Sequence, residues 1–394
     1  MGVYELEWLS LNLRGLHVII AATWIGTSFY IFSWENKFNK RFLNPGIEGN
    51  FWTIQGGDFY YVEKLNQAPE TLPDELHWFK YEAYFTWISG FLLLCILYYI
   101  HPSRTLINPN LTIITADAGI GIGISVLALS WLIYNFYCKT KYVENLPLSA
   151  GLGILTITLT GYLLSTIFTG QAAFLHIGAI LGTIMSANVF FIIIPWHKSL
   201  LAAINNKSSL EALYRAHPGI RSDHNHYLTL PVFFIMLSVH FPALNSNPHS
   251  WIVIPAIIIA AGFAKHVHTK IQQGQSGILP LTISILIFTG VALLSKPGVV
   301  QQNDCSKTTE MDEVIETVSR RCASCHSLTP SDPSLTAPPN GIIFDTPESV
   351  ISLKDRILER TVLTQTMPPA NKTGMTSRER QIINCWASGW DSID

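Results

Sequence analysis

Long apolar blocks dominate the first three quarters of this sequence, and they restrict the possible folds more than any other feature. Stretches long enough to cross a bilayer as helices occur eight times, at 9–33, 81–100, 118–137, 150–168, 172–195, 226–244, 250–267 and 278–295. Charged residues make up 13% of the chain, about half of the roughly 25% usual in soluble domains. The sequence therefore predicts an all-α polytopic membrane bundle of eight transmembrane helices over residues 1–295.

The last quarter of the chain has a different character. A polar linker at 296–311 leads into residues 312–394, which have ordinary charge density and turn-rich runs. Val314, Ile315 and Val318 recur at helical spacing, and Thr376 followed by Glu379 forms a capping box that opens a last helix. We expect a small helical domain over 312–394. The six cysteines are too few and too scattered to predict a disulfide scaffold.

Within this domain, Cys322-Ala323-Ser324-Cys325-His326 is the most specific short motif. CxxCH is the attachment signature of c-type haem, in which both thiols form thioethers and the histidine binds the iron. A zinc site or a thiol redox pair is the alternative, but zinc needs two more ligands and only Cys385 is nearby. The motif predicts a class I cytochrome c domain with covalent haem c. Met367 is the predicted sixth iron ligand, with Met375 as the alternative.

The haem motif also predicts an orientation. Haem c is attached on the outer face of the bacterial membrane, and eight spans then place the N-terminus outside as well. Thirteen Lys and Arg residues, Lys265 and Lys270 among them, fall on the loops assigned to the cytoplasm, whereas the outer loops contribute only Arg104. Both arguments predict a multi-pass protein of the bacterial cytoplasmic membrane, with its N-terminus and cytochrome domain on the periplasmic face.

Histidines at membrane depth are candidates for function. His17, His176 and His240 all fall in the outer third of their predicted spans. Their matching depth beside a haem c suggests a haem b held by two of the three. The alternative is that each histidine hydrogen-bonds a neighbouring helix.

Other polar side chains gather at the inner ends of the spans. His77-Trp78-Phe79-Lys80-Tyr81-Glu82 brings an acid, bases and aromatic rings to the start of the second span. Glu82 is alternatively a helix N-terminal carboxylate stabilised by the helix dipole. Asn188 lies deep in the fifth span, and Arg221, His224 and Asn225 precede the sixth. This end is the predicted polar site.

Several of these segments together resemble one enzyme family. They are 13–17 with 24–26, 56–60, 76–87, 182–190 and 221–231. With the CxxCH motif and the segment from Met367 to Met375, they resemble the PuuD-type membrane-bound urate hydroxylases, also called cytochrome c urate oxidases. The resemblance covers essentially the whole chain and includes the order of eight spans followed by a cytochrome.

The resemblance implies oxidation of urate to 5-hydroxyisourate in bacterial purine breakdown. Electrons would pass to haem c and on to a respiratory acceptor, a soluble cytochrome c or a terminal oxidase. Urate is a planar anion, so its site should offer aromatic faces and cationic or amide donors. The candidates for urate contact are Trp78, Lys80, Tyr81, Tyr84, Asn188, Arg221 and Asn225. The candidates for proton transfer are Glu82, His77 and His224.

These residues predict urate binding at the cytoplasmic end. The hydrocarbon core of about 30 Å is too wide for one efficient electron step, so one or more b haems would relay electrons outward. A respiratory electron-transfer subunit that oxidises quinol or a protein donor is the main alternative, and a membrane-anchored cytochrome is another. The net charge of −2 offers no basic surface for nucleic acid.

Overall fold

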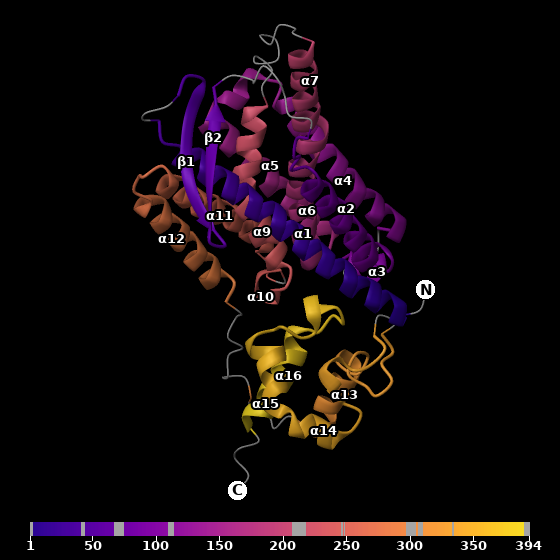
Figure 1. The fold of residues 1–394 in the computed structure, drawn as a ribbon. Coiled ribbons are helices and arrows are strands. Elements are labelled where there is room, and N and C mark those ends of the chain that lie inside the picture. The colour runs from indigo at the N-terminus through magenta and orange to yellow at the C-terminus, as the bar shows by residue number, and fades with distance from the viewer. Residues whose placement is uncertain are drawn as a thin grey trace.

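The computed structural model describes residues 3–40, 44–66, 75–108, 114–206, 218–245, 247, 249–296, 305, 310–332 and 335–389. A bundle of long helices is followed by a small group of short helices beside one end of it (Figure 1). The long helices are α1 (Val3–Lys37), α2 (Tyr81–Leu94), α4 (Ala116–Tyr137), α5 (Leu146–Ile167), α6 (Gly170–Asn188), α9 (Gly219–Ser238), α11 (Ser250–Gln272) and α12 (Ile278–Leu294). Each predicted span overlaps one of these helices. Shorter helices are α3 (Pro102–Thr105), α7 (Ile194–Asn205) and α10 (Pro242–Asn245).

Within the described residues, six helices are long and apolar enough to cross a membrane. They are α1, α2 with its π-helical extension Cys95–Tyr99, α4, α5, the continuous α6–α7 segment, and α11. Helix α12 is apolar but shorter. Large apolar side chains such as Leu132, Leu155 and Leu286 are exposed on the bundle. Such a surface suits contact with lipid rather than water.

Helix α9 begins earlier than predicted. The sequence suggests a loop up to residue 225, but the helix starts at Gly219 and includes Arg221, His224 and Asn225 in its first two turns. That part of the prediction is wrong because the side chains of these residues bond to neighbouring helices, which allows a polar segment to continue the helix inside the bundle.

Helix α6 is the centre of the bundle and packs against α2, α4, α5 and α9. The predicted spans 150–168 and 172–195 leave room only for a tight turn, and the structure confirms it. The Thr169 hydroxyl accepts a hydrogen bond from the Ala172 N–H at 3.2 Å and caps the helix. At Gly170, an added Cβ would lie 1.6 Å from the Asn245 carbonyl oxygen. Glycine is therefore required for α10 to approach the start of α6 so closely.

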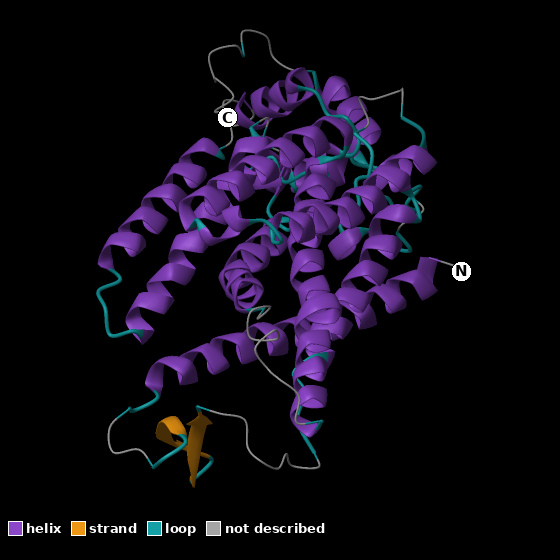
Figure 2. Cartoon of the chain, turned by 90° about the horizontal axis from the view of Figure 1, so that it is seen from above, coloured by secondary structure: helices purple, strands orange, loops and turns teal. Residues whose placement is uncertain are grey.

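A β-hairpin departs from the all-α prediction. Strand β1 (Ile47–Gln55) pairs antiparallel with β2 (Asp58–Leu65) through a turn at Gly56-Gly57. Both turn glycines have positive φ, +63° and +97°, as two-residue hairpin turns require. The hairpin lies at one edge of the bundle (Figure 2). Lys64 ties it to α1 through an ion pair with Glu35 at 2.8 Å.

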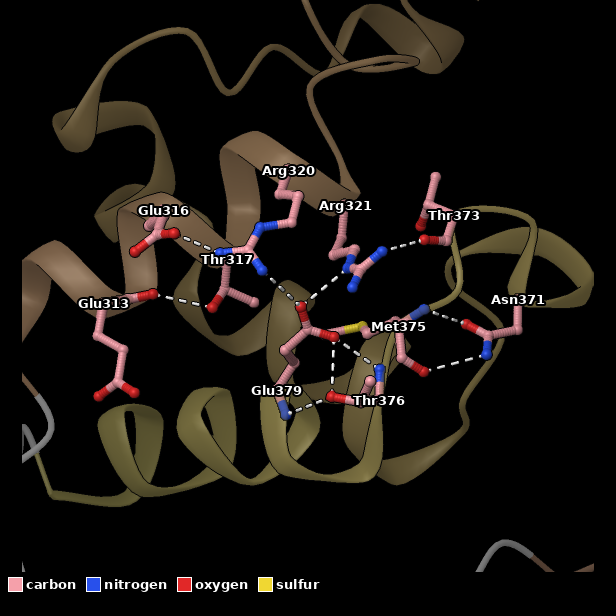
Figure 3. Close-up of polar contacts among 10 residues, drawn as sticks. All are labelled: Glu313, Glu316, Thr317, Arg320, Arg321, Asn371, Thr373, Met375, Thr376 and Glu379. Carbon is pink, nitrogen blue, oxygen red and sulfur yellow. Dashed lines mark hydrogen bonds and ion pairs between the residues drawn. The ribbon is translucent and has the colours of Figure 1, made fainter. Parts of the chain in front are cut away.

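The C-terminal region contains α13 (Met311–Arg321), α14 (Pro347–Ser352), α15 (Lys354–Leu358) and α16 (Ser377–Gly389). Its own apolar core includes Val314, Val318, Ile383 and Trp386. The predicted capping box is confirmed: Thr376 N–H donates to Glu379 Oε2 at 2.7 Å, and Glu379 N–H donates to Thr376 Oγ1 at 3.2 Å (Figure 3). The predicted linker at 296–311 lies mostly outside the described residues.

A disulfide joins Cys305 to Cys385 on α16. The sequence alone does not predict this bond, because the two cysteines are 80 residues apart and only the packed fold brings them together. The bond connects the segment that precedes α13 to the last helix of the same region.

Candidate functional site

The CxxCH motif faces a cavity of about 830 Å³ between the C-terminal region and one end of the bundle. Cys322, Cys325, His326 and Met367 all line it. Met375, the alternative ligand, is only 3% exposed and packs in the C-terminal core. The structure thus brings Met367, rather than Met375, to the wall that carries the motif.

The ring of His326 is held by a backbone carbonyl. His326 Nδ1 lies 3.1 Å from the Ile342 carbonyl oxygen, and in the tautomer that makes this bond Nδ1–H donates. The lone pair then resides on Nε2, which is how metal-binding histidines are usually oriented. The Phe344 N–H donates to the His326 carbonyl at 2.8 Å and fixes the backbone on the same side.

The loop that carries Met367 is also anchored. The Arg380 guanidinium donates to the Met367 carbonyl at 3.0 Å and to the Thr361 carbonyl. The Met367 N–H donates to the Arg360 carbonyl at 2.9 Å. Hydrogen bonds from both sides therefore hold the thioether-bearing loop against the cavity.

Both thiols of the CxxCH motif have raised pKa values. Burial raises the pKa of Cys322 to about 12 and also raises the pKa of Cys325. The Cys325 thiol donates to Asp332 Oδ2 at 3.6 Å.

The zinc alternative needs a group of at least three His, Cys, Asp or Glu side chains that could hold the ion. The part of the chain that the structure describes contains no such group. Two thiols, one oriented imidazole and one thioether on a single cavity are the donor set that fits haem c.

The bundle supplies the opposite wall of this cavity. Arg14 of α1, Tyr98 beyond α2 and Gln171 of α6 line it. The Thr336 hydroxyl also bonds Glu7 of α1 at 3.2 Å. The site on the C-terminal region therefore faces the helices of the bundle directly.

The three outer histidines have different surroundings. His17 Nδ1 lies 3.0 Å from the Ser89 hydroxyl, and His240 is exposed after the end of α9. Both ring nitrogens of the buried His176 are hydrogen-bonded, to the Ala172 carbonyl at 2.8 Å and to the Tyr99 hydroxyl at 3.0 Å. These contacts describe each histidine separately, and a haem b held by two of the three stays a prediction.

Four of the predicted inner residues belong to one buried hydrogen-bonded group, here called the α9 polar network. It comprises Tyr134 and Asn135 on α4, Asn188 on α6, and Arg221, His224 and Asn225 on α9. Arg221 donates to Asn188 Oδ1 at 3.0 Å and to Asn135 Oδ1 at 2.8 Å. The Asn188 amide donates to Asn225 Oδ1 at 3.0 Å and to the Tyr134 hydroxyl at 3.2 Å. Tyr134 in turn bonds His224 Nδ1 at 2.8 Å.

The remaining predicted residues lie at the start of α2 and form a separate aromatic group. Lys80 Nζ is 5.1 Å from the centre of the Trp78 ring and 4.9 Å from that of Tyr81. His77 and Tyr81 are exposed. Tyr84 packs edge-on against Phe190, with ring centres 5.1 Å apart. Glu82 Oε2 is buried and has no hydrogen-bond partner among the described residues.

Comparison with known families identifies the bundle. The model of the urate oxidase N-terminal family matches residues 3–296, from α1 through α12. The chain belongs to this family. Membership indicates an oxidoreductase that acts on urate, and the match stops before α13, which leads into the CxxCH motif. Searches of curated proteins and of solved structures found no match.

The family-matched bundle also contains a polar group that sequence reasoning missed, here called the Lys265 cluster. It comprises Phe29 and Phe32 on α1, His226 on α9, and Lys265 and His268 on α11. Lys265 was expected in a cytoplasmic loop, but it lies in α11 and is 0% exposed. Lys265 and His268 lie about one helical turn apart, directly after the apolar run 251–264 of the same helix, and this spacing is the signal that could have revealed the cluster.

Proposed function

We propose that this protein is a membrane-bound urate dehydrogenase of the cytochrome c urate oxidase type. In the proposed reaction, uric acid and water give 5-hydroxyisourate, two protons and two electrons. The electrons leave through the chain's covalent haem c, one at a time, to a soluble cytochrome c or a terminal oxidase. The observation that carries the proposal is the shared cavity, where the CxxCH motif and Met367 face the urate oxidase family bundle.

The same proposal assigns the haem ligands. Cys322 and Cys325 would hold the haem through its vinyl groups, and His326 and Met367 would bind its iron. When bound, this group supplies one-electron redox chemistry. The chain's own contribution is positional, because the Ile342 carbonyl orients His326 and Arg380 anchors the Met367 loop.

We further propose that all eight long helices span the bacterial cytoplasmic membrane, with the N-terminus and the C-terminal region outside. The start of α1 and the end of α12 both lie at the end of the bundle that faces the C-terminal region (Figure 1). The Cys305–Cys385 disulfide supports an oxidising compartment for that region. The predicted distribution of Lys and Arg supports the same orientation.

The decisive experiment uses the full-length, haem-loaded protein in detergent without oxygen. Addition of urate should reduce the c-type absorption band, and 5-hydroxyisourate should form at half a mole per mole of electrons delivered. The double variant Cys322→Ala/Cys325→Ala should lack covalent haem and the response. Reduction by a quinol with no response to urate would instead identify a respiratory electron-transfer subunit.

A matched pair of variants tests the assignment of the axial ligand. Met367→Leu should remove the thioether–iron charge-transfer band and lower the haem reduction potential, because a thioether ligand raises it. Met375→Leu should leave both unchanged, since Met375 lies in the core. The reverse pattern would assign the ligand to Met375.

A further inference from the structure

The Lys265 cluster has deeply buried polar atoms without partners. Lys265 Nζ and His226 Nε2 have no hydrogen-bond partner among the described residues, and the same holds for His268 Nδ1. His226 is only 8% exposed. Because an unpaired buried donor loses its water without compensation, this arrangement lowers stability unless a ligand completes it.

The surroundings of these atoms indicate the chemistry of that ligand. Lys265 Nζ lies 3.2 Å from the centre of the Phe29 ring, and His268 packs edge-on to the same ring at 4.7 Å. Phe32 stacks on His226 with ring centres 3.8 Å apart. No carboxylate forms an ion pair with Lys265 in the described part of the chain. Cationic donors between aromatic rings, with no acidic partner, suit a planar anion.

The Lys265 cluster lies far along the bundle from the cavity that carries the CxxCH motif. Helix α1 contacts the C-terminal region through Glu7 and Thr336, and at its other end Ser33 bonds Gln272 of α11 at 3.2 Å. Phe29 is fifteen residues from Arg14 at the haem-site cavity, which is about 22 Å along the helix. The cluster therefore lies toward the end of the bundle opposite the cavity that carries the CxxCH motif.

We propose that the Lys265 cluster is the anion-recognition part of the urate site, with the Lys265 ammonium as the principal charge partner of the oxopurine anion. His226 and His268 supply further hydrogen bonds, and Phe29 forms an aromatic wall. This inference rests on the proposed function. It differs from the sequence-based expectation, which put the cationic contacts on Lys80 and Arg221.

Two substitutions in α11 provide the test. Lys265→Met keeps the length of the side chain but removes its charge. Lys270→Met removes a charge about one and a half turns further on, from a half-buried side chain that donates to Gln275 Oε1 at 2.7 Å. Urate binding is measured by equilibrium dialysis with labelled urate and by the urate-induced rise in Tm. The urate concentration that gives half-maximal reduction of the c band is measured on the same samples.

Loss of a hydrogen bond to a charged group should weaken urate binding by about tenfold to hundredfold in Lys265→Met, and abolish most of the Tm rise. Lys270→Met should bind as the wild type does. His226→Gln should weaken binding in the same direction, and it replaces Lys265→Met if that variant does not accumulate with covalent haem.

The outcomes separate the two proposals. Urate binding that is unchanged in both Lys265→Met and His226→Gln, with a responsive wild type, overturns the assignment of the cluster and leaves the proposed function intact. A wild type that neither binds urate nor is reduced by it overturns the proposed function itself.

Discussion

Helix α9 carries two polar groups that differ in their hydrogen bonding. In the α9 polar network, Arg221 is 7% exposed and Asn188 of α6 is 0% exposed. The Arg221 guanidinium donates to the side-chain oxygens of Asn135 and Asn188. The Asn188 amide nitrogen donates to the side-chain oxygen of Asn225. In the Lys265 cluster, His226 and Lys265 are equally buried. His226 Nε2 and Lys265 Nζ have no hydrogen-bond partner among the described residues. Paired buried groups hold helices in register, whereas unpaired ones destabilise a fold. The contrast teaches that membrane depth alone does not identify a binding site.

The largest expected effect comes from breaking the α9 polar network. Arg221→Met leaves the side-chain oxygens of Asn135 and Asn188 without their donor. We expect a loss of about 3–5 kcal/mol of unfolding free energy, measured as a fall in Tm by tryptophan fluorescence in detergent. Arg378→Met, at an exposed position on α16, is the control. An unchanged Tm in Arg221→Met would contradict the distinction between paired and unpaired groups, because the α9 polar network would then not stabilise the bundle.

The same measurement on Lys265→Met should change in the opposite direction. Removal of an unpaired buried ammonium should raise the unfolding free energy of the urate-free protein by about 1–2 kcal/mol. A variant that is more stable yet binds urate less well is the signature of a side chain kept for binding. A fall in Tm without urate would show that the cation–π contact with Phe29 stabilises the bundle in its own right.

A third polar group, in the C-terminal region, extends the comparison to an aqueous setting. Arg321 Nε donates to Glu379 Oε1 at 2.8 Å, beside the Thr376 capping bonds (Figure 3). Burial raises the pKa of the Glu379 carboxyl, but the hydrogen bonds from Thr376 and Arg321 outweigh it and hold the pKa below the ordinary 4.5. A depressed pKa gives stability that is present above the ordinary value and is lost as the pH falls through the lowered one.

Glu379→Gln should therefore destabilise the C-terminal region by about 0.5–2 kcal/mol at neutral pH. The difference from the wild type should shrink as the pH falls below 4.5, the ordinary Glu value. The measurement is thermal unfolding at a series of pH values, followed by the absorption band of the proposed haem c. A difference that is constant across this range would exclude the carboxylate as its source.

The smallest effect is expected for Lys270→Met without urate. Its half-buried ammonium donates to the Gln275 amide oxygen five residues further on, so the unfolding free energy should change by less than about 0.5 kcal/mol. A larger change would mean that charge at this end of α11, rather than the burial of Lys265, produces the effects assigned to the cluster.

Local rules predicted the features that depend on neighbouring residues in the sequence. The apolar blocks located the long helices, the turn at Thr169 and Gly170 was anticipated, and the capping box at Thr376 formed as expected. The β-hairpin is not predicted, although its Gly56-Gly57 turn is a local signal, because a segment between two apolar spans is expected to be a loop.

Features that depend on packing were beyond local rules. The Cys305–Cys385 bond requires the folded C-terminal region, and the burial of Lys265 depends on how α1 and α9 cover one face of α11. The predicted span 250–267 already includes Lys265, but a Lys so close to the end of a span is counted with the cytoplasmic loop that follows. Only the packed bundle separates the paired Arg221 from the unpaired Lys265, although the sequence presents both as cations near span ends.

The Cys305–Cys385 disulfide also determines how far the C-terminal region can move from the bundle. Since Cys305 is bonded to α16, nine residues of chain from Lys296 act as the tether, with a maximum reach of about 32 Å. A covalent connection this short keeps the C-terminal region close to the end of the bundle, whatever path it takes. Weak contacts such as Thr336 with Glu7 therefore suffice for docking. In the proposed function, a soluble electron acceptor would have to approach a tethered donor. Reduction of the disulfide would lengthen the tether without altering either partner.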